Sequence, residues 1–379
     1  MAGAEAVNML KLRASYGRTG NIYQGATSYM TATTGTTNRF NRLPKATIDS
    51  PGNPNLSWER TSTFNVGMDF SLFDRSVRGA VDWYNKKSDK VFASKSLEST
   101  TGFTNLVMNF ADVKNNGLEM TLAYDWVRPR SRDGFGWTTS ATAAWNRNEV
   151  THVEIQARQA SQVIDLGYKQ GYPVSSMFSY VFAGLDADGV QTWKAADGRE
   201  VMAAELHTIS PESVVFSGQA EPKHTYAMEN HFTWRGFSLN VMMVYYGGHK
   251  MRALPVTAMV GNPTVAPLAS YYLDAWTPEN TNTVVPGIGQ YNKTSAASAQ
   301  VRNSDIFIQP ADFLKIRNIV FGYDVPKDII SRVGLSNLSL RFQIDNLAPL
   351  WMKNDLGVDP ETLGVRRPTS YVFGLNFRF

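Results

Sequence analysis

The sequence has 379 residues, of which 12% are aromatic and 18% are charged, and its formal net charge is +4 at pH 7. This composition is too apolar for a disordered chain and is sufficient for a large apolar core or surface. Lys and Arg are scattered along the sequence, which argues against a nucleic-acid partner. The absence of cysteine excludes disulfides and cysteine-ligated metals, and no run of about 18 apolar residues predicts a transmembrane helix.

Alternation of apolar and polar residues with a period of two recurs along the whole chain, which predicts an all-β protein. We expect about ten antiparallel strands from this pattern. They lie at residues 8–16, 58–73, 75–89, 112–127, 136–149, 224–235, 237–249, 311–324, 336–347 and 369–379. In residues 311–324 the alternation changes phase between Ile316 and Ile319, which indicates a β-bulge.

The connections between these strands alternate between short and long. Short ones lie near residue 74, at 128–135, near residue 236 and at 325–335, and long ones cover 17–57, 90–111, 150–223, 250–310 and 348–368. Outer-membrane barrels have this alternation, with short periplasmic turns and long extracellular loops. The sequence therefore predicts a segment of a transmembrane antiparallel β-barrel.

The distribution of charge supports the same interpretation. The apolar faces of residues 64–72, 118–126 and 371–379 contain no Asp, Glu, Lys or Arg. A charge on the lipid side of a barrel costs roughly 2–4 kcal/mol at the middle of the bilayer. Tryptophans near the strand ends predict the aromatic girdles of a membrane protein; they are Trp83, Trp126, Trp137, Trp145 and Trp234. A soluble antiparallel sheet with its apolar face on a core remains an alternative.

The last ten residues form the most aromatic of the predicted strands. Its apolar face consists of Tyr371, Phe373, Leu375, Phe377 and Phe379. Chain ends usually fray, so an aromatic face that reaches the last residue indicates a strand that must pair to complete a sheet.

Several segments, in order along nearly the whole chain, resemble the SusC/RagA family of TonB-dependent outer-membrane transporters. They are LKLRASYGRTGN (10–21), NPNLSWERTSTFNVGMDF (53–70), SGQAEPKHTYAMENHFTWRGFSL (217–239), AWTPENTNTVVP (275–286), FLKIRNIVFGYDVP (313–326) and VDPET (358–362). The aromatic C-terminal strand resembles the signal that the outer-membrane assembly machinery reads.

This resemblance implies that residues 1–379 are the C-terminal portion of a barrel of about 22 strands. The plug domain and the N-terminal strands are absent from the sequence, so we expect an obligate complex with a chain that supplies the plug and about twelve strands. The origin of the chain as a natural split, a cleavage product or a fragment stays open. Two unpaired sheet edges would otherwise favour aggregation.

The resemblance also implies a function, a location and partners. We expect the wall and extracellular loops of a nutrient importer in the outer membrane of a Gram-negative bacterium, surrounded by outer-membrane lipid. The ligand would be an oligosaccharide or an oligopeptide, captured under a SusD-like surface lipoprotein, and TonB would act through the missing plug. No enzymatic activity and no cofactor are implied.

No catalytic or metal-binding pattern is present in the sequence. The histidines are far apart, at His152, His207, His224, His231 and His249. Asp186 and Asp188 begin an acidic loop, but Val190 and Gln191 break the calcium-loop pattern, so a turn-rich hairpin is the preferred interpretation. We therefore predict neither a metal site nor a cofactor site.

Candidate contacts to the substrate or to the lid are aromatic and basic residues of the long connections, because aromatic rings stack on sugars and pack against peptide side chains. They are Tyr23, Tyr29, Arg39, Tyr180, Trp193, Tyr271, Tyr272, Trp276 and Tyr291. The connections 150–223 and 250–310 would serve the lipoprotein lid equally well. The functional alternative is a soluble β-rich carbohydrate-binding or glycan-cleaving domain, which would need two carboxylates roughly 5–10 Å apart. Asp69, Glu119 and Asp125 are better explained as lumen-facing residues.

Overall fold

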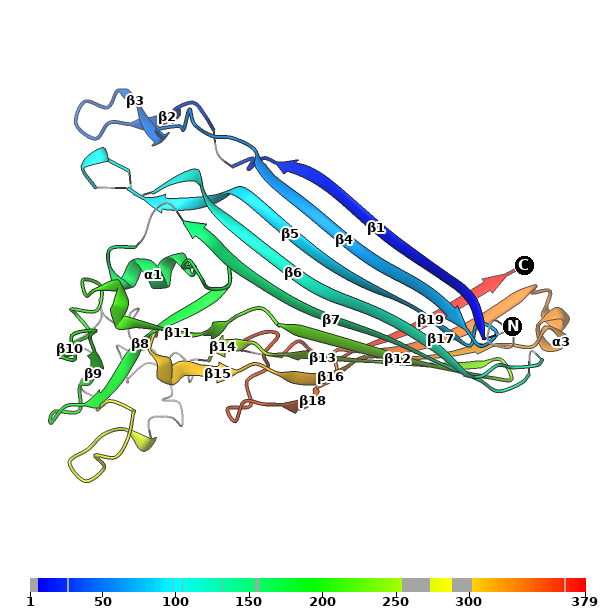
Figure 1. The fold of residues 1–379 in the computed structure, drawn as a ribbon. Coiled ribbons are helices and arrows are strands. Elements are labelled where there is room, and N and C mark those ends of the chain that lie inside the picture. Colours follow the sequence, from blue (N-terminus) through cyan, green and yellow to red (C-terminus); the bar gives the residue numbers. More distant parts are fainter. Residues whose placement is uncertain are drawn as a thin grey trace.

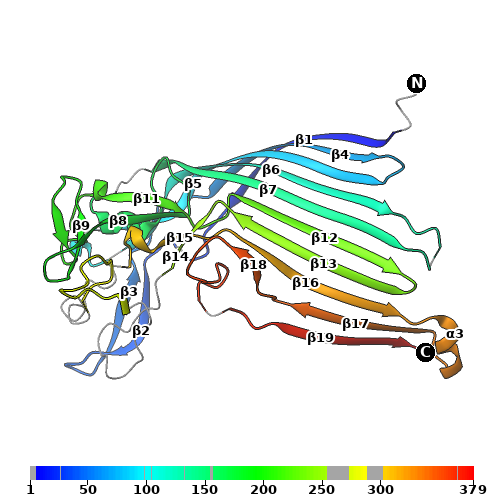
Figure 2. The same cartoon turned by 90° about the horizontal axis from the view of Figure 1, so that it is seen from below.

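The structure is a computed structural model that describes residues 6–25, 27–97, 99–103, 105–131, 133–153, 157–253, 273–287, 302–364 and 366–379. A single antiparallel sheet forms a curved wall along most of this length (Figures 1 and 2). In the described ranges, no helix has both the length and the apolar character needed to cross a membrane.

Ten strands follow one another across the wall in chain order. They are β1 (Val7–Asn21), β4 (Glu59–Leu72), β5 (Val77–Ser96), β6 (Asn105–Val127), β7 (Gly136–Val153), β12 (His224–Trp234), β13 (Phe237–Gly247), β16 (Phe313–Asp324), β17 (Asn337–Asp345) and β19 (Ser370–Arg378). A short strand, β18 (Pro349–Met352), pairs with the start of β16. Each predicted strand corresponds to one of these ten, so the all-β prediction is confirmed. Within the described residues, β1 and β19 form the two margins of the wall.

Short turns join the strands at one end of the wall and long connections join them at the other (Figure 1). The β12–β13 turn consists of Arg235 and Gly236, both with positive φ, as a tight hairpin of matching twist requires. The longest short-end connection contains α3 (Lys327–Ile330) and the 3₁₀ turn η6 (Ser331–Val333). The expected segregation of short and long connections is confirmed.

Register gives the wall one apolar and one polar face, because residues opposite each other in neighbouring strands share a face. Met68 of β4 pairs with Val81 of β5, which pairs with Met120 of β6, and these lie on the apolar face. One residue further along β4, Asp69 pairs with Lys11 of β1 on the polar face.

Two rows of aromatic rings border the apolar face. Near the short turns, Trp137 stacks on Trp126 at 5.1 Å and on Phe232 at 5.6 Å. Near the long connections, the Trp145 ring lies 5.5 Å from Tyr226. Trp137 and Trp145 are eight residues apart on β7, about 27 Å along the strand or roughly 20 Å along a membrane normal at the usual tilt. This height is close to that of the apolar band of an outer-membrane barrel.

The structure confirms the predicted bulge but contradicts one of the predicted long loops. The register between β13 and β16 shifts between Met242 and Met243, opposite Arg317, so the predicted bulge is confirmed. The expectation of a long loop at 90–111 is wrong, because β5 and β6 continue as a hairpin to Ser96 and from Asn105. Apolar side chains hold this extension together: buried Phe110 packs with Val91 and Met108 in one cluster.

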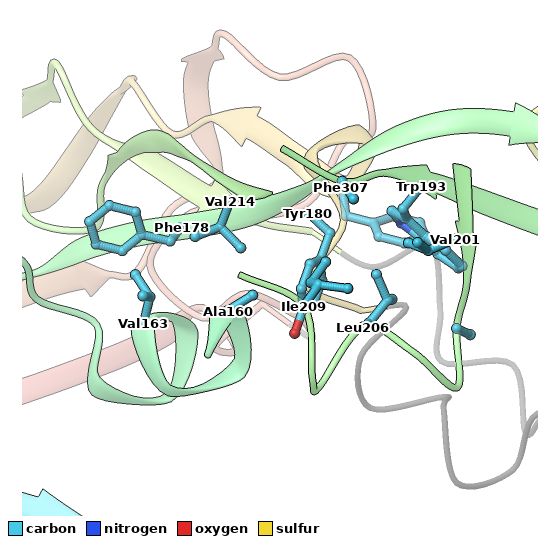
Figure 3. Packing of buried hydrophobic residues seen from close by; sticks show 12 residues of the cluster. Ala160, Val163, Phe178, Tyr180, Trp193, Val201, Leu206, Ile209, Val214 and Phe307 are labelled. Atoms are coloured by element: carbon cyan, nitrogen blue, oxygen red, sulfur yellow. The ribbon is translucent and has the colours of Figure 1, made fainter. Parts of the chain in front are cut away.

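The connection from β7 to β12 folds into a separate extracellular lobe with its own core. It contains α1 (Ala160–Leu166), β8 (Ser176–Leu185), β9 (Gln191–Lys194), β10 (Glu200–Met202), η2 (Pro211–Ser213) and β11 (Val214–Gln219). In Figure 3, Val163 from α1 lies at one end of this core, and Trp193 and Val201 lie at the other with Phe307. Phe307 comes from η5 (Asp305–Phe307), more than a hundred residues later in the chain. The core therefore joins the lobe to a distant rim segment.

Three smaller elements complete the rim. The β2–β3 hairpin (Thr31–Thr37 and Pro44–Ser50) lies beyond the end of β1, outside the strand ends of the wall (Figure 1). β14 (Lys250–Arg252) pairs with β15 (Ile308–Pro310), and η1 (Ser99–Thr101) lies in the β5–β6 connection.

Candidate functional site

The polar face of the wall carries paired charges in its first four strands. The Arg13 guanidinium donates to both carboxylate oxygens of Asp69, at 2.9 and 2.8 Å, and to Asp82 at 2.9 Å. Gly67 lies between these partners, and a Cβ there would be 2.3 Å from an Asp82 oxygen. A glycine at this position therefore leaves the space in which the ion pairs form. Arg78 and Asp125 make a similar bidentate pair nearer the short turns, at 2.7 and 2.9 Å.

At the extracellular rim, the first two resembling segments contact each other. The Glu59 carboxylate accepts from the Asn21 amide at 2.8 Å and from the Phe92 backbone N–H at 2.7 Å. The Trp58 ring lies on Gly20, where a Cβ would be 2.9 Å from a ring carbon. Glu59 thus joins the end of β1 to β5 at the point where the chain leaves the wall for the β2–β3 hairpin.

Asparagines hold the base of this hairpin. The Asn109 side chain accepts from Ser57 N–H at 2.8 Å and donates to the carbonyls of Ser57 and Lys90, both at 2.7 Å. Asn53, which is buried, donates to the Val107 carbonyl at 3.4 Å. These bonds satisfy backbone groups that would otherwise lack partners at an irregular junction. They fix where the hairpin starts and ends.

On the other side of the wall, two further resembling segments meet at Glu361. Lys315, whose side chain is 1% exposed, donates to Glu361 Oε2 at 2.7 Å, and Arg317 donates to Glu361 Oε1 at 2.7 Å. Burial alone raises the pKa of Glu361, but the hydrogen bonds from Lys315 and Arg317 outweigh it and lower this pKa below its ordinary value of 4.5. The carboxylate therefore stays ionised and holds residues 353–364 against β16.

A second polar group lies beside this cluster. Asp312 accepts from the Gly248 backbone N–H at 3.0 Å, and its oxygens lie 3.6 Å from Lys353 Nζ and 4.0 Å from His249 Nδ1. Burial lowers the pKa of His249, and the negative charge of Asp312 opposes this effect in part. The imidazole is therefore neutral at pH 7.

The lobe is attached to the rim by main-chain and side-chain bonds. Tyr180 N–H donates to the Asn303 carbonyl at 2.9 Å, and the Trp193 indole donates to Ser304 Oγ at 3.1 Å. The Arg252 guanidinium donates to the carbonyls of Phe178 and Arg302, at 3.0 and 2.9 Å. Burial raises the pKa of Tyr180, with a contribution from the nearby Asp165 charge.

Four of the predicted contact residues lie at the extracellular end with part of their surface accessible. Tyr23 is 47% exposed and lies 6.0 Å from the Phe92 ring, and Tyr29 is 82% exposed. Arg39 is exposed near the tip of the β2–β3 hairpin. Trp276 is half-buried against Gly189 of the lobe. The structure brings Trp276 to the lobe and leaves the other three on or near the hairpin.

Of the other predicted contacts, two are buried and three lie outside the residues that the structure describes. Tyr180 and Trp193 are both 0% exposed in the lobe core, so they present no surface to a substrate or a lid. Their aromatic rings serve packing instead, which the sequence pattern of a polar connection did not indicate. The predicted contacts Tyr271, Tyr272 and Tyr291 lie outside the described residues.

The acidic loop forms the turn-rich hairpin that we preferred over a calcium site. Asp186 Oδ1 accepts from the backbone N–H groups of Asp188 and Val190, both at 2.9 Å. Across the described ranges, no group of three His, Asp or Glu residues has a geometry that could hold a metal ion. His224 and His231 lie seven residues apart on β12, and the other three histidines lie on other segments.

Sequence reasoning did not identify three contacts that join separate segments at the rim. They are made by Asn109, by Glu59 and by the Lys315–Arg317–Glu361 cluster. One sequence signal could have indicated the last of these contacts. Lys315 and Arg317 lie where the alternation of apolar and polar residues in 311–324 changes phase. A bulge re-aims side chains where it occurs, so charges at such a position mark a tertiary contact. The partner Glu361 could not be identified because it lies 44 residues beyond Arg317.

Comparison with known proteins gives a consistent result. The family profile described as "TonB dependent receptor-like, beta-barrel" matches residues 5–347. TonB-dependent receptor P26 of Formosa agariphila is 24% identical over 381 residues, which covers 95% of this chain and 37% of that protein. TonB-dependent receptor SusC of Bacteroides thetaiotaomicron is 30% identical over 154 residues, covering 38% of this chain and 15% of SusC.

Among solved structures, the RagAB peptide transporter has the same fold. Its TM-score is 0.78 at 23% identity, and the match covers 98% of this chain and 41% of that chain. The chain spans between 36% and 40% of the length of three Formosa receptors that it matches. Because the barrel profile covers most of its residues, the chain belongs to the TonB-dependent receptor family, as part of a β-barrel of the outer membrane of Gram-negative bacteria.

Proposed function

We propose that the chain forms wall and extracellular loops of an importer that takes oligosaccharides or oligopeptides across the outer membrane. The observation that carries this proposal is the curved sheet with an apolar face bordered by aromatic rows and a polar face with paired charges. Such a wall separates lipid from an aqueous lumen. The likeness to a structure named a peptide transporter supports the oligopeptide class, and the resemblance to the SusC/RagA family keeps the oligosaccharide class beside it.

The energy-coupling parts would lie outside residues 1–379. We propose that the remaining N-terminal part of the barrel pairs with the margins β1 and β19, which have one bonded neighbour each within the described residues. A plug in the lumen would connect the transporter to TonB, and a SusD-like lipoprotein would cover the extracellular opening. The chain itself would be the C-terminal portion of the barrel.

The ligand or the lid would contact the extracellular end of the wall. Tyr23, Tyr29, Arg39 and Trp276 are proposed contacts because each keeps accessible surface there. The exposed apolar side chains Phe40 and Leu43, 95% and 61% exposed, extend the same surface of the β2–β3 hairpin. Exposed apolar surface of this kind marks an interaction site.

Purification of the native complex from outer membranes, followed by mass spectrometry, tests the proposal. We expect a surface lipoprotein and the plug-bearing part of the barrel to copurify, with a bound oligosaccharide or oligopeptide. An unrelated outer-membrane barrel purified with the same tag is the control. Recovery of the chain from a soluble fraction without detergent would contradict the proposal.

The alternative of a soluble carbohydrate-binding or glycan-cleaving domain does not fit the wall. Its apolar face would need a covering layer, and the described residues supply none over the strands between the aromatic rows. Asp69 and Asp125, two of the carboxylates considered for such a domain, are engaged by Arg13 and Arg78.

A further inference from the structure

Four cations lie in register on the outer face of the wall and form what we call the basic belt: Arg18, Lys87, Lys114 and Arg147. Arg18 pairs with Ser62, which pairs with Lys87, and Lys87 pairs with Lys114. Arg147 lies one row nearer the membrane, opposite Asn116. The belt thus crosses five neighbouring strands, from β1 to β7.

The belt shares its face with the lipid-facing residues. Arg18 continues the series Leu12, Ala14 and Tyr16 on β1, without a register shift between them. On β5, Lys87 lies four residues after Trp83, and no shift separates the two. Because strand side chains alternate with a period of two, both cations point the same way as these apolar residues.

Along the membrane normal, the basic belt lies at the level of the lipid headgroups. Arg147 is two residues beyond Trp145, and Lys87 is four residues beyond Trp83. These spacings correspond to about 7–14 Å along the strand, and less along the membrane normal because strands tilt. Girdle tryptophans lie at the boundary between hydrocarbon and headgroups, so the next one or two rows reach the phosphate layer.

Within the described residues the belt cations form no ion pair, and Arg18 donates a single side-chain hydrogen bond to a neutral group, the Tyr16 hydroxyl, at 3.3 Å. The ion pairs of the described residues use inner-face or loop cations such as Arg13, Arg78 and Lys315, and none uses a belt residue. Glu149 lies opposite Lys114, but the two form no ion pair within 4.0 Å. Inner-face cations such as Arg13 and Arg78 are thus neutralised within the wall, whereas the belt cations remain available to a partner in the membrane.

We infer that the basic belt binds the phosphate groups of anionic lipids in the outer leaflet. Arg18 and Arg147 present guanidinium forks that match a phosphate with two parallel hydrogen bonds, and the lysines add point charges. A cation near an anionic membrane surface contributes roughly a fivefold gain in binding. The inference depends on the position of the sheet in the membrane and not on the imported ligand.

The test uses the full-length transporter that contains these residues, purified from outer membranes and placed in nanodiscs. One set contains zwitterionic phosphatidylcholine only, and the other adds monophosphoryl lipid A. We expect the anionic lipid to raise Tm of the wild type and to be retained in native mass spectra. The variant R18Q/K87Q/K114Q/R147Q should lose at least about tenfold in retention of that lipid and most of the Tm increase.

The matched control removes four exposed cations at other heights, in the variant K194Q/K327Q/R332Q/R366Q, and should behave like the wild type. Equal loss in both variants, or undiminished retention in the belt variant, would overturn the inference.

Inorganic phosphate added to the neutral nanodiscs distinguishes the source: the same Tm increase there would assign the site to free phosphate. If the fourfold variant fails to assemble, the double variant R18Q/R147Q should show an intermediate loss, and unchanged retention would overturn the inference.

Discussion

Glu361 is the residue on which the loop after β18 depends. Its two oxygens accept one hydrogen bond each from Lys315 and Arg317, and Lys315 is 1% exposed. A buried ammonium without an ionised partner is unfavourable, because burial removes its hydration. The carboxylate therefore stabilises both the loop and the buried lysine.

Replacing Glu361 with Gln should loosen residues 353–364 while the wall stays intact. Losing two charge-assisted hydrogen bonds should cost roughly 2 kcal/mol of local stability. Hydrogen exchange with mass spectrometry would detect faster exchange in this segment and unchanged exchange in β16. Asp355→Asn, which neutralises an exposed carboxylate of the same loop, is the control and should leave exchange unchanged.

The same contact predicts a pH dependence with a defined sign. Because the pKa of Glu361 is lowered in the folded protein, its contribution is complete above its ordinary value of 4.5 and is lost as pH falls through the lower folded value. Protection of residues 353–364, corrected for intrinsic exchange, should therefore decrease on acidification. In Glu361→Gln this decrease should be absent; a decrease of equal size in the variant would assign the effect to another group.

At the scale of the element, the bulge lets β16 keep an apolar outer face and also present an additional cation to Glu361. Ile316 lies opposite Met243 and Asn318 opposite Met242, so Arg317 is the additional residue. The strand keeps its apolar residues on the outer face on both sides of this point, and it gains one inward cation for Glu361. The bulge therefore creates a tertiary contact inside a regular wall.

Deletion of Arg317 should be tolerated by the barrel. The deletion removes the additional residue and leaves Ile316 and Asn318 in their present register, so no apolar side chain changes face. Deletion of Val320 should impair assembly, because it would turn Phe321 and Tyr323 away from the outer face. Heat-modifiable mobility on gels and the yield in outer membranes measure both variants. Equal yields would contradict this account of the bulge.

Sequence patterns located the ten main strands of the wall, though not the short β18, because a strand that faces lipid on one side and water on the other must alternate. This information is local and visible in residues such as Met68 and Asp69. The lobe was missed because its core depends on contacts between distant segments, as between Trp193 and Ser304. A buried aromatic residue of this kind cannot be distinguished from an exposed ligand contact by its sequence surroundings, so the site was predicted only in part.

At the scale of the whole molecule, the wall presents tryptophans to lipid at two heights and hides another in the lobe. Trp83, Trp126, Trp145 and Trp234 are 41%, 53%, 38% and 52% exposed, whereas Trp193 is fully buried. This distribution follows from the two aromatic rows and from the separate core of the lobe.

Phospholipids with brominated acyl chains should therefore quench the fluorescence of the reconstituted barrel. Much of the quenching should disappear in W83F/W126F/W145F/W234F, because these indoles lie at the edge of the hydrocarbon. Trp193→Phe should remove only unquenched emission. Quenching that is independent of the four outer tryptophans would contradict the orientation of the wall.

The attachment of the lobe has a consequence for how such proteins diversify. β7 and β12, the strands on either side of it, are hydrogen-bonded neighbours, so the wall is continuous beneath the insertion. A recombination event that exchanges residues between these strands alters what the cell displays to its surroundings and leaves the membrane-embedded register untouched. The same junction offers an insertion point for surface epitopes in engineered strains.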